Sequence, residues 1–489
     1  MKLFEFLKSK GYDISDTEFM KPYIQQWLEW YKGDIPKFQK YYIYNGNKKV
    51  WYTRKTLNMP KKLSEDFANF LLNEKVDYTI GNNKTTDEFY KLLESVKFER
   101  VANQGIEKTF ALGTGAFVVN IKDLKYDETN DIVYADEDAK LTFDFIQADK
   151  LIPLSYEGDN VTECAFVNYK TMGKQKFMFL SIHRKATEED EYPTGNYLIE
   201  NYVFLVDKTG NITDVTETKL DNALKTFDTG SDIKWFTVLT PNITNNLCDN
   251  SPFGISIYAN SLDIIKGADI AYDSLVNEFI LGRKRIFVKS DLMQPDTSTG
   301  EMKFVFDPNE SVYHQLPIGA SNEPDVKEND FKLRIQEHEN GIQIQLNLLS
   351  SNLGMGSSHY RFDNGALTTA TQVISENSDL YRTINKHEII LREKLLEIFN
   401  AIIYIANTYL TGYSIQGDIA IDFDDSIIED TEKNRNKSLI EYNTGLISQV
   451  QYFVETRDMT TKQAEKFVKT MQEQKLEEQP ELEEEPIEE

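Results

Sequence analysis

The sequence predicts an α+β protein, and two patterns carry this prediction. Residues 367 to 411 contain neither glycine nor proline, and apolar residues recur there at helical spacing. From about 115 to 243 the apolar residues instead alternate with a period of two, in short segments separated by Gly, Asn, Asp and Pro clusters, which is typical of antiparallel strands. We therefore expect a sheet-rich first half and a mainly helical second half.

The N-terminal region combines helices with these strands. Amphipathic patterns predict helices over 15–32, 62–76 and 86–111. Residues 113–115 (GTG) are too short for a phosphate loop and predict a turn into a strand. The segments expected to form strands are AFVVNI, LTFDFI, ECAFVNY, KFMFLSI, YLIENYVFLV and IKWFTVL.

The second half begins with a helix of about 28 residues within 251–282, roughly 40 Å long. A strand, RKRIFVKS, follows it, and the turn-rich residues 291–330 suit a small β-containing lobe. A shorter helix carries Ile342, Leu346 and Leu349 at helical spacing and ends at a glycine-rich loop, LGMGSSHYRFDNGA.

The helix predicted after this loop would approach 70 Å at about 1.5 Å per residue, and its length suggests a strut shared by several domains. The segment IAIDFDDS (419–426) is strand-like, and 429–475 indicates two or three helices. The last residues, LEEQPELEEEPIEE, contain eight acids and no basic residue, a composition typical of disorder.

The composition limits the possible functions. The 489 residues suffice for about three domains. The net charge of −26 counts against tight duplex DNA binding, because that affinity comes mainly from neutralising phosphates.

Cys164 and Cys248 are too few for a disulfide framework, so we expect packed thiols in a reducing compartment. No stretch approaches 18 uncharged apolar residues, so we expect a soluble protein that does not cross a membrane and is not secreted.

One basic segment contrasts with this acidic chain. Residues 37 to 62 contain eight Lys or Arg and no acid, interleaved with tyrosines and a tryptophan. Two interpretations are open: a nucleic-acid surface with aromatic stacking, or an arm that docks on an acidic neighbouring subunit. The basic residues considered for this arm include Lys48, Lys49, Arg54 and Lys55.

Nothing in the sequence motivates catalysis, and we expect no enzyme activity and no cofactor. Asp422, Asp424 and Asp425 could hold a hard cation, but no calcium-loop pattern accompanies them, so capping or solvation is the simpler interpretation. GxxxxGK[ST], paired zinc-ligand spacing and G-x-S-x-G are all absent. We therefore expect no metal site.

The order of helix, loop and very long helix resembles the portal proteins of tailed double-stranded DNA bacteriophages, of the siphophage type found in Gram-positive hosts or a related prophage. The residues that carry the resemblance are LRIQEHENGIQIQLNLLSSNLGMG (333–356) and ATQVISENSDLYRTINKHE (370–388). The resemblance is strong over about 250 to 410 and weaker but collinear elsewhere.

This resemblance implies a portal-like subunit with an α/β wing, a two-helix stem, a small clip, a long wing helix and a helical crown. It implies the following divisions: 1–253 wing, 254–282 stem helix, 283–335 clip, 336–352 second stem helix, 353–366 tunnel loop, 367–428 long wing helix and strand, 429–475 crown and 476–489 acidic tail.

The resemblance also implies a homo-oligomeric ring of about twelve subunits at one capsid vertex, in the virion after assembly in the host cytoplasm. Double-stranded DNA would pass through its channel during packaging and ejection. The implied protein partners are the large terminase subunit and then a head-tail adaptor at the clip, and scaffolding and major capsid proteins at the wing.

Two groups of site residues follow from the resemblance. Ser357, Ser358, His359, Tyr360 and Arg361 would face DNA from the tunnel loop. Arg283, Lys284 and Arg285 would contact DNA or the packaging motor, although cations also favour the C-terminal end of a helix for its dipole.

A different class of function remains as the alternative: a metal-dependent nucleic-acid-processing enzyme whose basic N-terminal arm binds substrate.

Overall fold

The computed structural model describes most of the chain. The residues outside the description are 46–47, 73–75, 128–131, 135–138, 221–224, 283–284, 290–292, 296–301, 305–312, 317–325, 330–331, 362–369, 424–430, 458 and 478–489. The described chain forms two compact units, Met1–Leu367 with Arg382–Phe423, and Thr368–Tyr381 with Asp424–Glu489.

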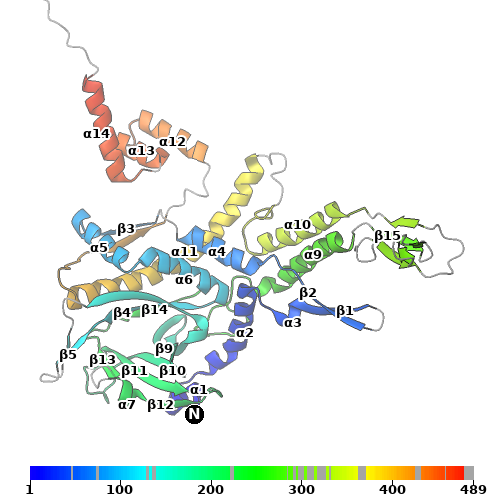
Figure 1. The fold of residues 1–489 in the computed structure, drawn as a ribbon. Coiled ribbons are helices and arrows are strands. Elements are labelled where there is room, and N and C mark those ends of the chain that lie inside the picture. The colour runs from blue at the N-terminus through cyan, green and yellow to red at the C-terminus, as the bar shows by residue number, and fades with distance from the viewer. Residues whose placement is uncertain are drawn as a thin grey trace, which may run out of the picture. The chain divides into compact units, whose positions relative to one another are not determined.

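The structure confirms a mixed α+β fold (Figure 1). The helices are α1 (Leu3–Ser9), α2 (Ser15–Lys32), α3 (Pro36–Gln39), α4 (Met59–Leu71), α5 (Asn83–Ser95), α6 (Phe98–Leu112), η1 (Ala148–Lys150), α7 (Thr216–Lys219), η2 (Ala259–Ser261), α9 (Leu262–Leu281), α10 (Ile335–Asn352), α11 (Ala370–Tyr409), α12 (Thr431–Asn443), α13 (Gln449–Arg457) and α14 (Thr461–Glu477).

The strands lie between these helices. They are β1 (Lys40–Asn45), β2 (Lys48–Thr53), β3 (Asp77–Ile80), β4 (Gly115–Lys122), β5 (Lys125–Asp127), β6 (Ile132–Tyr134), β7 (Lys140–Gln147), β8 (Leu151–Glu157), β9 (Asn160–Met172), β10 (Gln175–Lys185), β11 (Tyr197–Val206), β12 (Ile212–Asp214), β13 (Thr226–Asp228), β14 (Phe236–Leu239), β15 (Arg285–Lys289), β16 (Met293–Pro295), β17 (Met302–Phe304), β18 (Tyr313–Leu316), β19 (Val326–Asn329) and β20 (Ile419–Asp422).

The largest sheet has the strand order β12-β11-β10-β9-β8, with β13 paired to β11, and its pairs are antiparallel as the alternating pattern predicts. Helix α1 packs on it through Phe6 and Leu7, which join a core that contains Ile182 and Phe204. This sheet and α1 therefore enclose an apolar core within a single chain.

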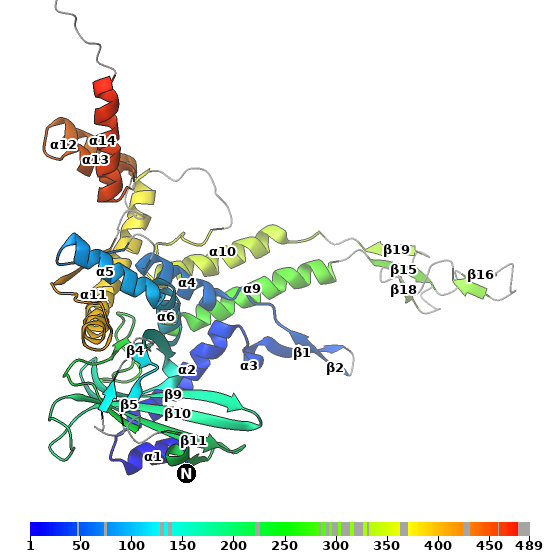
Figure 2. The same ribbon diagram turned by 60° about the vertical axis from the view of Figure 1, so that its left-hand side comes forward.

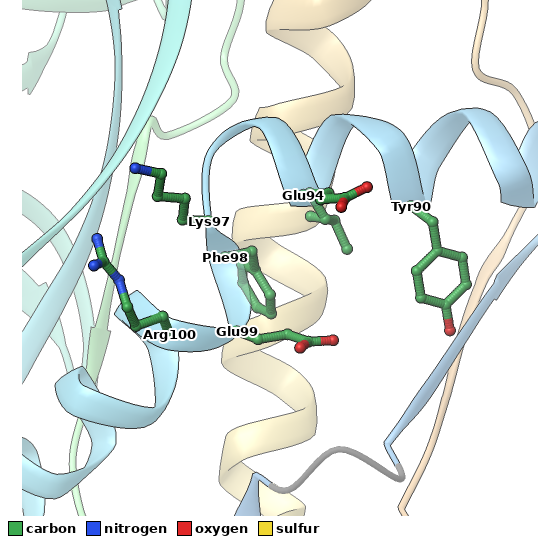
Figure 3. Close-up of a pocket in the computed structure, with 7 residues that line it drawn as sticks. Tyr90, Glu94, Lys97, Phe98, Glu99 and Arg100 are labelled. Atoms are coloured by element: carbon green, nitrogen blue, oxygen red, sulfur yellow. The ribbon is translucent and has the colours of Figure 1, made fainter.

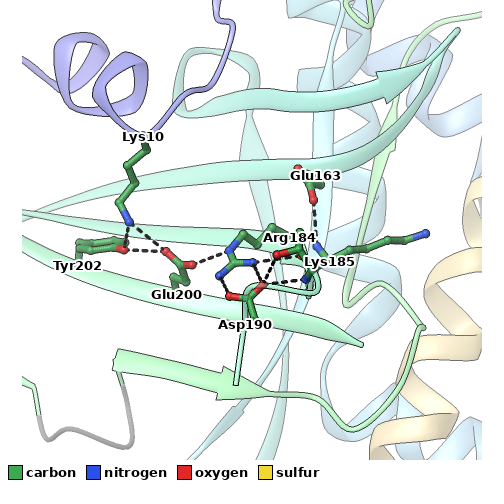
Figure 4. Close-up of polar contacts among 8 residues, drawn as sticks. Lys10, Glu163, Arg184, Lys185, Asp190, Glu200 and Tyr202 are labelled. Carbon is green, nitrogen blue, oxygen red and sulfur yellow. Dashed lines mark hydrogen bonds and ion pairs between the residues drawn. The ribbon is translucent and has the colours of Figure 1, made fainter. Parts of the chain in front are cut away.

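An ion-pair network ties α1 to the same sheet (Figure 4). Lys10 contacts Glu200 at 3.4 Å, and Arg184 Nε donates to the other oxygen of Glu200 at 2.5 Å. The Arg184 guanidinium also pairs with Asp190 in a bidentate arrangement at 2.6 and 2.7 Å. Hydrogen bonds from Arg184 and from the Thr187 backbone hold the pKa of Asp190 far below its usual value.

Helices α6 and α11 contribute to a second core beside the three-stranded sheet β14-β4-β7. Gly105 of α6 lies so close to Phe117 that an added Cβ would come within 2.6 Å of its ring. Phe399 of α11 is fully buried and meets Tyr78 and Phe98 at ring-centroid distances of 5.1 and 5.0 Å.

The helix expected over 86–111 is in fact two helices, so that prediction is wrong in one respect. Lys97 adopts a left-handed conformation (φ 56°) between α5 and α6. The break lets Phe98 enter the aromatic core against Phe143 and Phe399. Tertiary packing thus outweighs a local pattern that is helical throughout.

Helices α9 and α10 pack together and lead to the sheet β18-β15-β19 (Figure 2). Helix α9 begins at Leu262, later than the 28-residue prediction. The preceding segment instead bonds to the end of α6 and to the turn that follows it, because Ile257 N donates to Phe110 O and Gly254 N donates to Thr114 Oγ1. Helix α10, Ile335–Asn352, agrees with its prediction.

The long helix is confirmed as α11, Ala370–Tyr409, and its residues contribute to both units. Much of its apolar stripe is buried inside the first unit, from Ile384 to Ala406. The region 429–475, where two or three helices were predicted, contains three, α12, α13 and α14, and Phe453, Ala464 and Val468 form a core in this second unit.

Two further predictions concern cysteines and membranes. Cys164 is buried, as expected for a packed thiol, whereas Cys248 is partly exposed, and both are free. Across the part of the chain that the structure describes, no helix combines the length and apolarity that a membrane span requires.

Candidate functional site

The loop after α10 starts with two glycines that reverse the chain. Gly354 and Gly356 have φ values of 69° and 82°, which side chains other than glycine's adopt at a cost. Met355 between them is buried, and its amide donates to Ser350 O at 2.9 Å. The start of the loop is therefore fixed to the end of α10.

Gly354 also joins the loop to α11. Thr383 Oγ1 donates to Gly354 O at 2.9 Å, and a Cβ on Gly354 would collide with the same hydroxyl. Only glycine satisfies both the backbone conformation and this close approach.

Tyr360 anchors the far side of the described loop. Its hydroxyl donates to Asp66 Oδ2 of α4 at 2.7 Å, and Gln343 of α10 donates to its carbonyl at 2.7 Å. Burial and the adjacent Asp66 raise the pKa of Tyr360 far above its usual value, so the hydroxyl stays protonated. The loop is thus held by α4 and α10 together.

His359 lies in a partly desolvated aromatic environment that favours its neutral form. Its ring packs edge-on against Phe70 and Tyr360, with centroid distances of 5.9 and 4.7 Å, and desolvation lowers its pKa. It can offer a hydrogen bond to a ligand, whereas the positive charge of the segment lies on Arg361.

Ser357 and Arg361 are exposed, and Ser358 is partly covered. The structure therefore brings the five predicted loop residues into one segment but places them differently: Tyr360 points into the subunit, while Ser357 and Arg361 lie at the surface. The rest of the predicted loop, 362–366, lies outside the described residues.

The helix pair that leads into this loop is closely packed. An added Cβ at Gly267 of α9 would lie 2.8 Å from Gln345 of α10. At the other end, Arg334 donates to both carboxylate oxygens of Glu278, at 3.2 and 2.9 Å. These bonds hold the pKa of Glu278 at about 2. Both ends of the pair are therefore fixed relative to each other.

The predicted basic cluster after α9 is only partly described. Arg283 and Lys284 lie outside the described residues, and Arg285 is the first residue of β15, opposite Asn329 of β19. Arg285 is thus the first residue of the sheet beyond the helix pair, and not the end of the helix.

The basic arm is a hairpin, β1 and β2, that projects beside α9 (Figure 2). Lys48 and Lys49 lie in its second strand and are exposed. Arg54 lies at its base, where its guanidinium covers the Phe38 ring at 4.3 Å and donates to Phe38 O. The next residue, Lys55, donates its amide to Asp273 at 2.9 Å. The four predicted residues therefore divide between the tip and the base.

Sequence reasoning missed the residues that hold this hairpin. Asp269 of α9 is buried and accepts hydrogen bonds from Leu57 N and Thr56 Oγ1, each at 2.8 Å. Asp273, one turn later, accepts from Tyr41 and Lys55. The available signal was the spacing of Asp269 and Asp273, which lie four residues apart and therefore on one face of the predicted helix.

Two other features of the described chain lie apart from the loop and the hairpin. Asp422 lies in β20 opposite Asp77, and its predicted companions Asp424 and Asp425 are outside the described residues. A half-open cavity of about 440 Å³ lies where α5 meets α6, with Lys97 and Arg100 directed to one side and Glu94 and Glu99 to the other (Figure 3). None of the cavity's residues belongs to a predicted site.

Comparison with known proteins now identifies the class. The family described as "Phage portal protein, SPP1 Gp6-like" matches residues 12–481. A chain in the solved structure titled "Neck of native GTA particle computed with C12 symmetry" is similar over 81% of this chain and 89% of its own, with 10% identity and a TM-score of 0.36. None of the curated proteins matches.

The match over nearly the whole chain defines the protein as a structural component of a phage particle. More particularly, the chain belongs to the family of SPP1 Gp6-like phage portal proteins.

Proposed function

We propose that this protein forms a closed ring of about twelve copies at one vertex of a phage head, and that the ring is the channel for DNA packaging and ejection. The observation that carries the proposal is the family match over residues 12–481. The chain acts without catalysis or cofactor, and the packaging motor supplies the energy.

The proposed division of the subunit follows the observed element order. The wing is 1–253, the stem is 254–282 and 336–352, which contain α9 and nearly all of α10, the clip is 283–335, and the tunnel loop is 353–366. The long wing helix and its strand occupy 367–428, the crown 429–475 and the acidic tail 476–489. Ring formation is supported by exposed apolar side chains on both stem helices, including Ile270, Phe279, Ile344 and Leu348.

The proposed partners follow from this division. The large terminase subunit binds the clip during packaging, and a head-tail adaptor replaces it afterwards. Scaffolding and major capsid proteins bind the wing, and double-stranded DNA occupies the channel. The protein assembles in the host cytoplasm and remains in the virion.

The tunnel loop is proposed to touch moving DNA. Arg361 supplies one positive charge and Ser357 one hydroxyl, both exposed, while Tyr360 fixes the segment to α4. One cation is enough to contact a phosphate but too little to hold it, because strong duplex binding needs many neutralised phosphates. Arg283, Lys284 and Arg285 are assigned to contacts at the clip.

Electron microscopy and mass measurement of the purified full-length protein test the ring. We expect closed rings of about twelve subunits under conditions that favour assembly. A stable dimer with no larger species at any salt or protein concentration would contradict the proposal.

Arg361→Glu tests the channel role of the loop. We expect rings and melting temperature to remain nearly unchanged while DNA packaging or retention falls. Lys84→Glu, an equal charge reversal on the exposed surface of α5, is the matched control. Normal packaging by the Arg361 variant would refute the channel contact, and failure to form rings would make the loop a structural joint.

A further inference from the structure

The hairpin β1–β2 exposes an aromatic surface that its own subunit leaves uncovered. Tyr42, Tyr44, Lys49 and Trp51 share one face of the hairpin, since Tyr42 pairs with Trp51 and Tyr44 with Lys49. Trp51 is 65% exposed and Tyr44 60% exposed. A two-stranded hairpin is marginally stable alone, and exposed apolar clusters of this kind mark interaction surfaces.

The base of the hairpin is nevertheless fixed to α9. Asp269 and Asp273 of α9 accept four hydrogen bonds from its base, from Leu57, Thr56, Lys55 and the Tyr41 hydroxyl. The strands then extend about 20 Å beyond this base. A hairpin whose base is fixed and whose tip is exposed can contact a partner molecule without moving relative to its own chain.

A matching surface lies on α10. Ile344 and Leu348 are 57% and 52% exposed, and each lies about 200° around the helix from a buried residue, Ile342 or Leu346. Glu337 is exposed on the same side, two turns before Ile344. This strip is apolar with an acidic end.

The charges of the two surfaces are complementary. Strands β1 and β2 contain three lysines and no acid, whereas α10 contains Glu337 and Glu339 and no lysine or arginine. Such complementarity steers association and fixes register between the surfaces.

One subunit cannot bring these surfaces together. Gly267 of α9 faces Gln345 of α10, and Asp269, which holds the hairpin, lies about 200° around α9 from Gly267. The hairpin therefore stands on the side of α9 away from α10, as both views show (Figures 1 and 2). Complementary patches on different sides of one chain are the requirement for a head-to-tail contact between copies.

We propose that the aromatic face of the β1–β2 hairpin docks on the Glu337, Ile344 and Leu348 strip of α10 in the next copy of this chain. The proposal rests on the ring proposed above and specifies one of its interfaces. A nucleic acid fits the hairpin less well. The Tyr42 ring is covered by the Lys49 ammonium at 4.4 Å and meets Trp51 edge-on at 66°, so Tyr42 and Trp51 do not form a parallel platform on which successive bases could stack.

A charge-reversal experiment on the full-length protein tests this contact. The first variant carries Lys48→Glu and Lys49→Glu, and the second carries Glu337→Lys and Glu339→Lys. Each variant alone places like charges at every contact, so we expect the protein concentration for half-assembly to rise at least tenfold. Mixed in equal amounts, the two variants can alternate around a ring with every contact complementary, and we expect assembly to return toward the wild-type concentration.

An apolar pair of variants provides a second measurement. Tyr44→Ser with Trp51→Ser, and Ile344→Ser with Leu348→Ser, should each weaken assembly at least tenfold, and their combination should weaken it little further because both remove the same contact. Tyr169→Ser with Met172→Ser, exposed positions on β9, is the matched control.

The outcomes separate this contact from the ring itself. A wild-type protein that forms no rings refutes the proposed function. Wild-type rings with unimpaired variants, or with no rescue in the mixture of folded variants, refute the hairpin contact alone. Variants that assemble normally but lose DNA retention show that the hairpin is a nucleic-acid surface.

Discussion

The sheet β8–β12 and the hairpin β1–β2 are both antiparallel, but they differ in how far their apolar side chains are buried by the rest of the chain. The sheet packs Ile182 and Phe204 against α1, with both residues fully buried. The hairpin leaves Tyr44 and Trp51 largely exposed. The sheet is therefore stable within one chain, whereas the hairpin has apolar surface that a partner can remove from water.

The buried carboxylates of the two regions also differ, in the direction in which their pKa values are shifted. Glu200 in the sheet is paired with Arg184 and Lys10, and hydrogen bonds and positive charge outweigh burial and lower its pKa. Asp269 under the hairpin accepts hydrogen bonds from Leu57 and Thr56, and burial dominates and raises its pKa. The carboxylate of Glu200 is therefore stabilised by charged partners, whereas the carboxylate of Asp269 is bound by uncharged hydrogen-bond donors.

The largest expected effect contrasts two aromatic truncations. Phe204→Ala should lower the free energy of unfolding by about 3 to 5 kcal/mol, because it opens a cavity in a closed core. Trp51→Ala should change it by less than about 1 kcal/mol in unassembled protein, because the ring already contacts water. Urea unfolding at protein concentrations below assembly measures both. Equal losses would show that the hairpin packs within its own subunit.

Backbone strain gives the next largest effect. Gly354→Ala should destabilise the protein by about 1 to 3 kcal/mol, because its φ is positive and Thr383 occupies the space for a Cβ. Gly341→Ala in α10 has open space and should stabilise by up to about 1 kcal/mol. Thermal unfolding of the unassembled variants distinguishes them, and a neutral Gly354→Ala would show that the loop yields at this position.

Acidification should affect the stability contributions of the two regions in opposite directions. The lowered pKa values of Glu200 and Asp190 mean that their contribution to stability is present above their ordinary values, near 4, and is lost as pH falls below them. The raised pKa of Asp269 has the opposite sign, because its charged form is disfavoured in the folded protein and protonation relieves that cost.

Urea midpoints measured from pH 7 to pH 3 test this difference. Arg184→Gln should flatten the acid loss of stability relative to wild type, whereas Asp269→Asn should leave that loss in place. Identical pH profiles for wild type and Arg184→Gln would contradict the assigned network.

The sequence predicted regular elements well where one periodicity continued. Alternating residues predicted β9, β10 and β11, and the glycine-free interval predicted α11. The prediction failed where distant contacts decide the backbone. The left-handed Lys97 interrupts a helical sequence pattern, which allows Phe98 to contact Phe399. The amide of Ile257 donates to the carbonyl of Phe110, so the segment before Leu262 is not helical and α9 begins later than predicted.

The candidate site shows the same limit. Composition predicted the loop around His359 and the basic hairpin, because glycines, lysines and aromatic residues are local signals. The contacts that position them come from Asp66 and Asp269, which are 294 and 212 residues from Tyr360 and Leu57 along the chain. Such pairings depend on the fold: the sequence can show two aspartates on one helix face, as at Asp269 and Asp273, but not the distant residues that bond to them.

The smallest expected effect concerns the acidic tail, which belongs to neither kind of region. Deletion of residues 476–489 removes eight acids and changes the net charge from −26 to −18, but the apolar residues that form the core of the second unit, Phe453, Ala464 and Val468, lie before the cut. Eight of the fourteen deleted residues are acidic and only Leu476, Leu482 and Ile487 are apolar, so we expect the segment to contribute little to a core, and ring assembly and melting temperature should remain as in the full chain. Sedimentation and thermal unfolding of the truncated protein measure both. Loss of folding would show that the tail docks on the subunit, and tighter assembly would show that its charge opposes the approach of acidic neighbours.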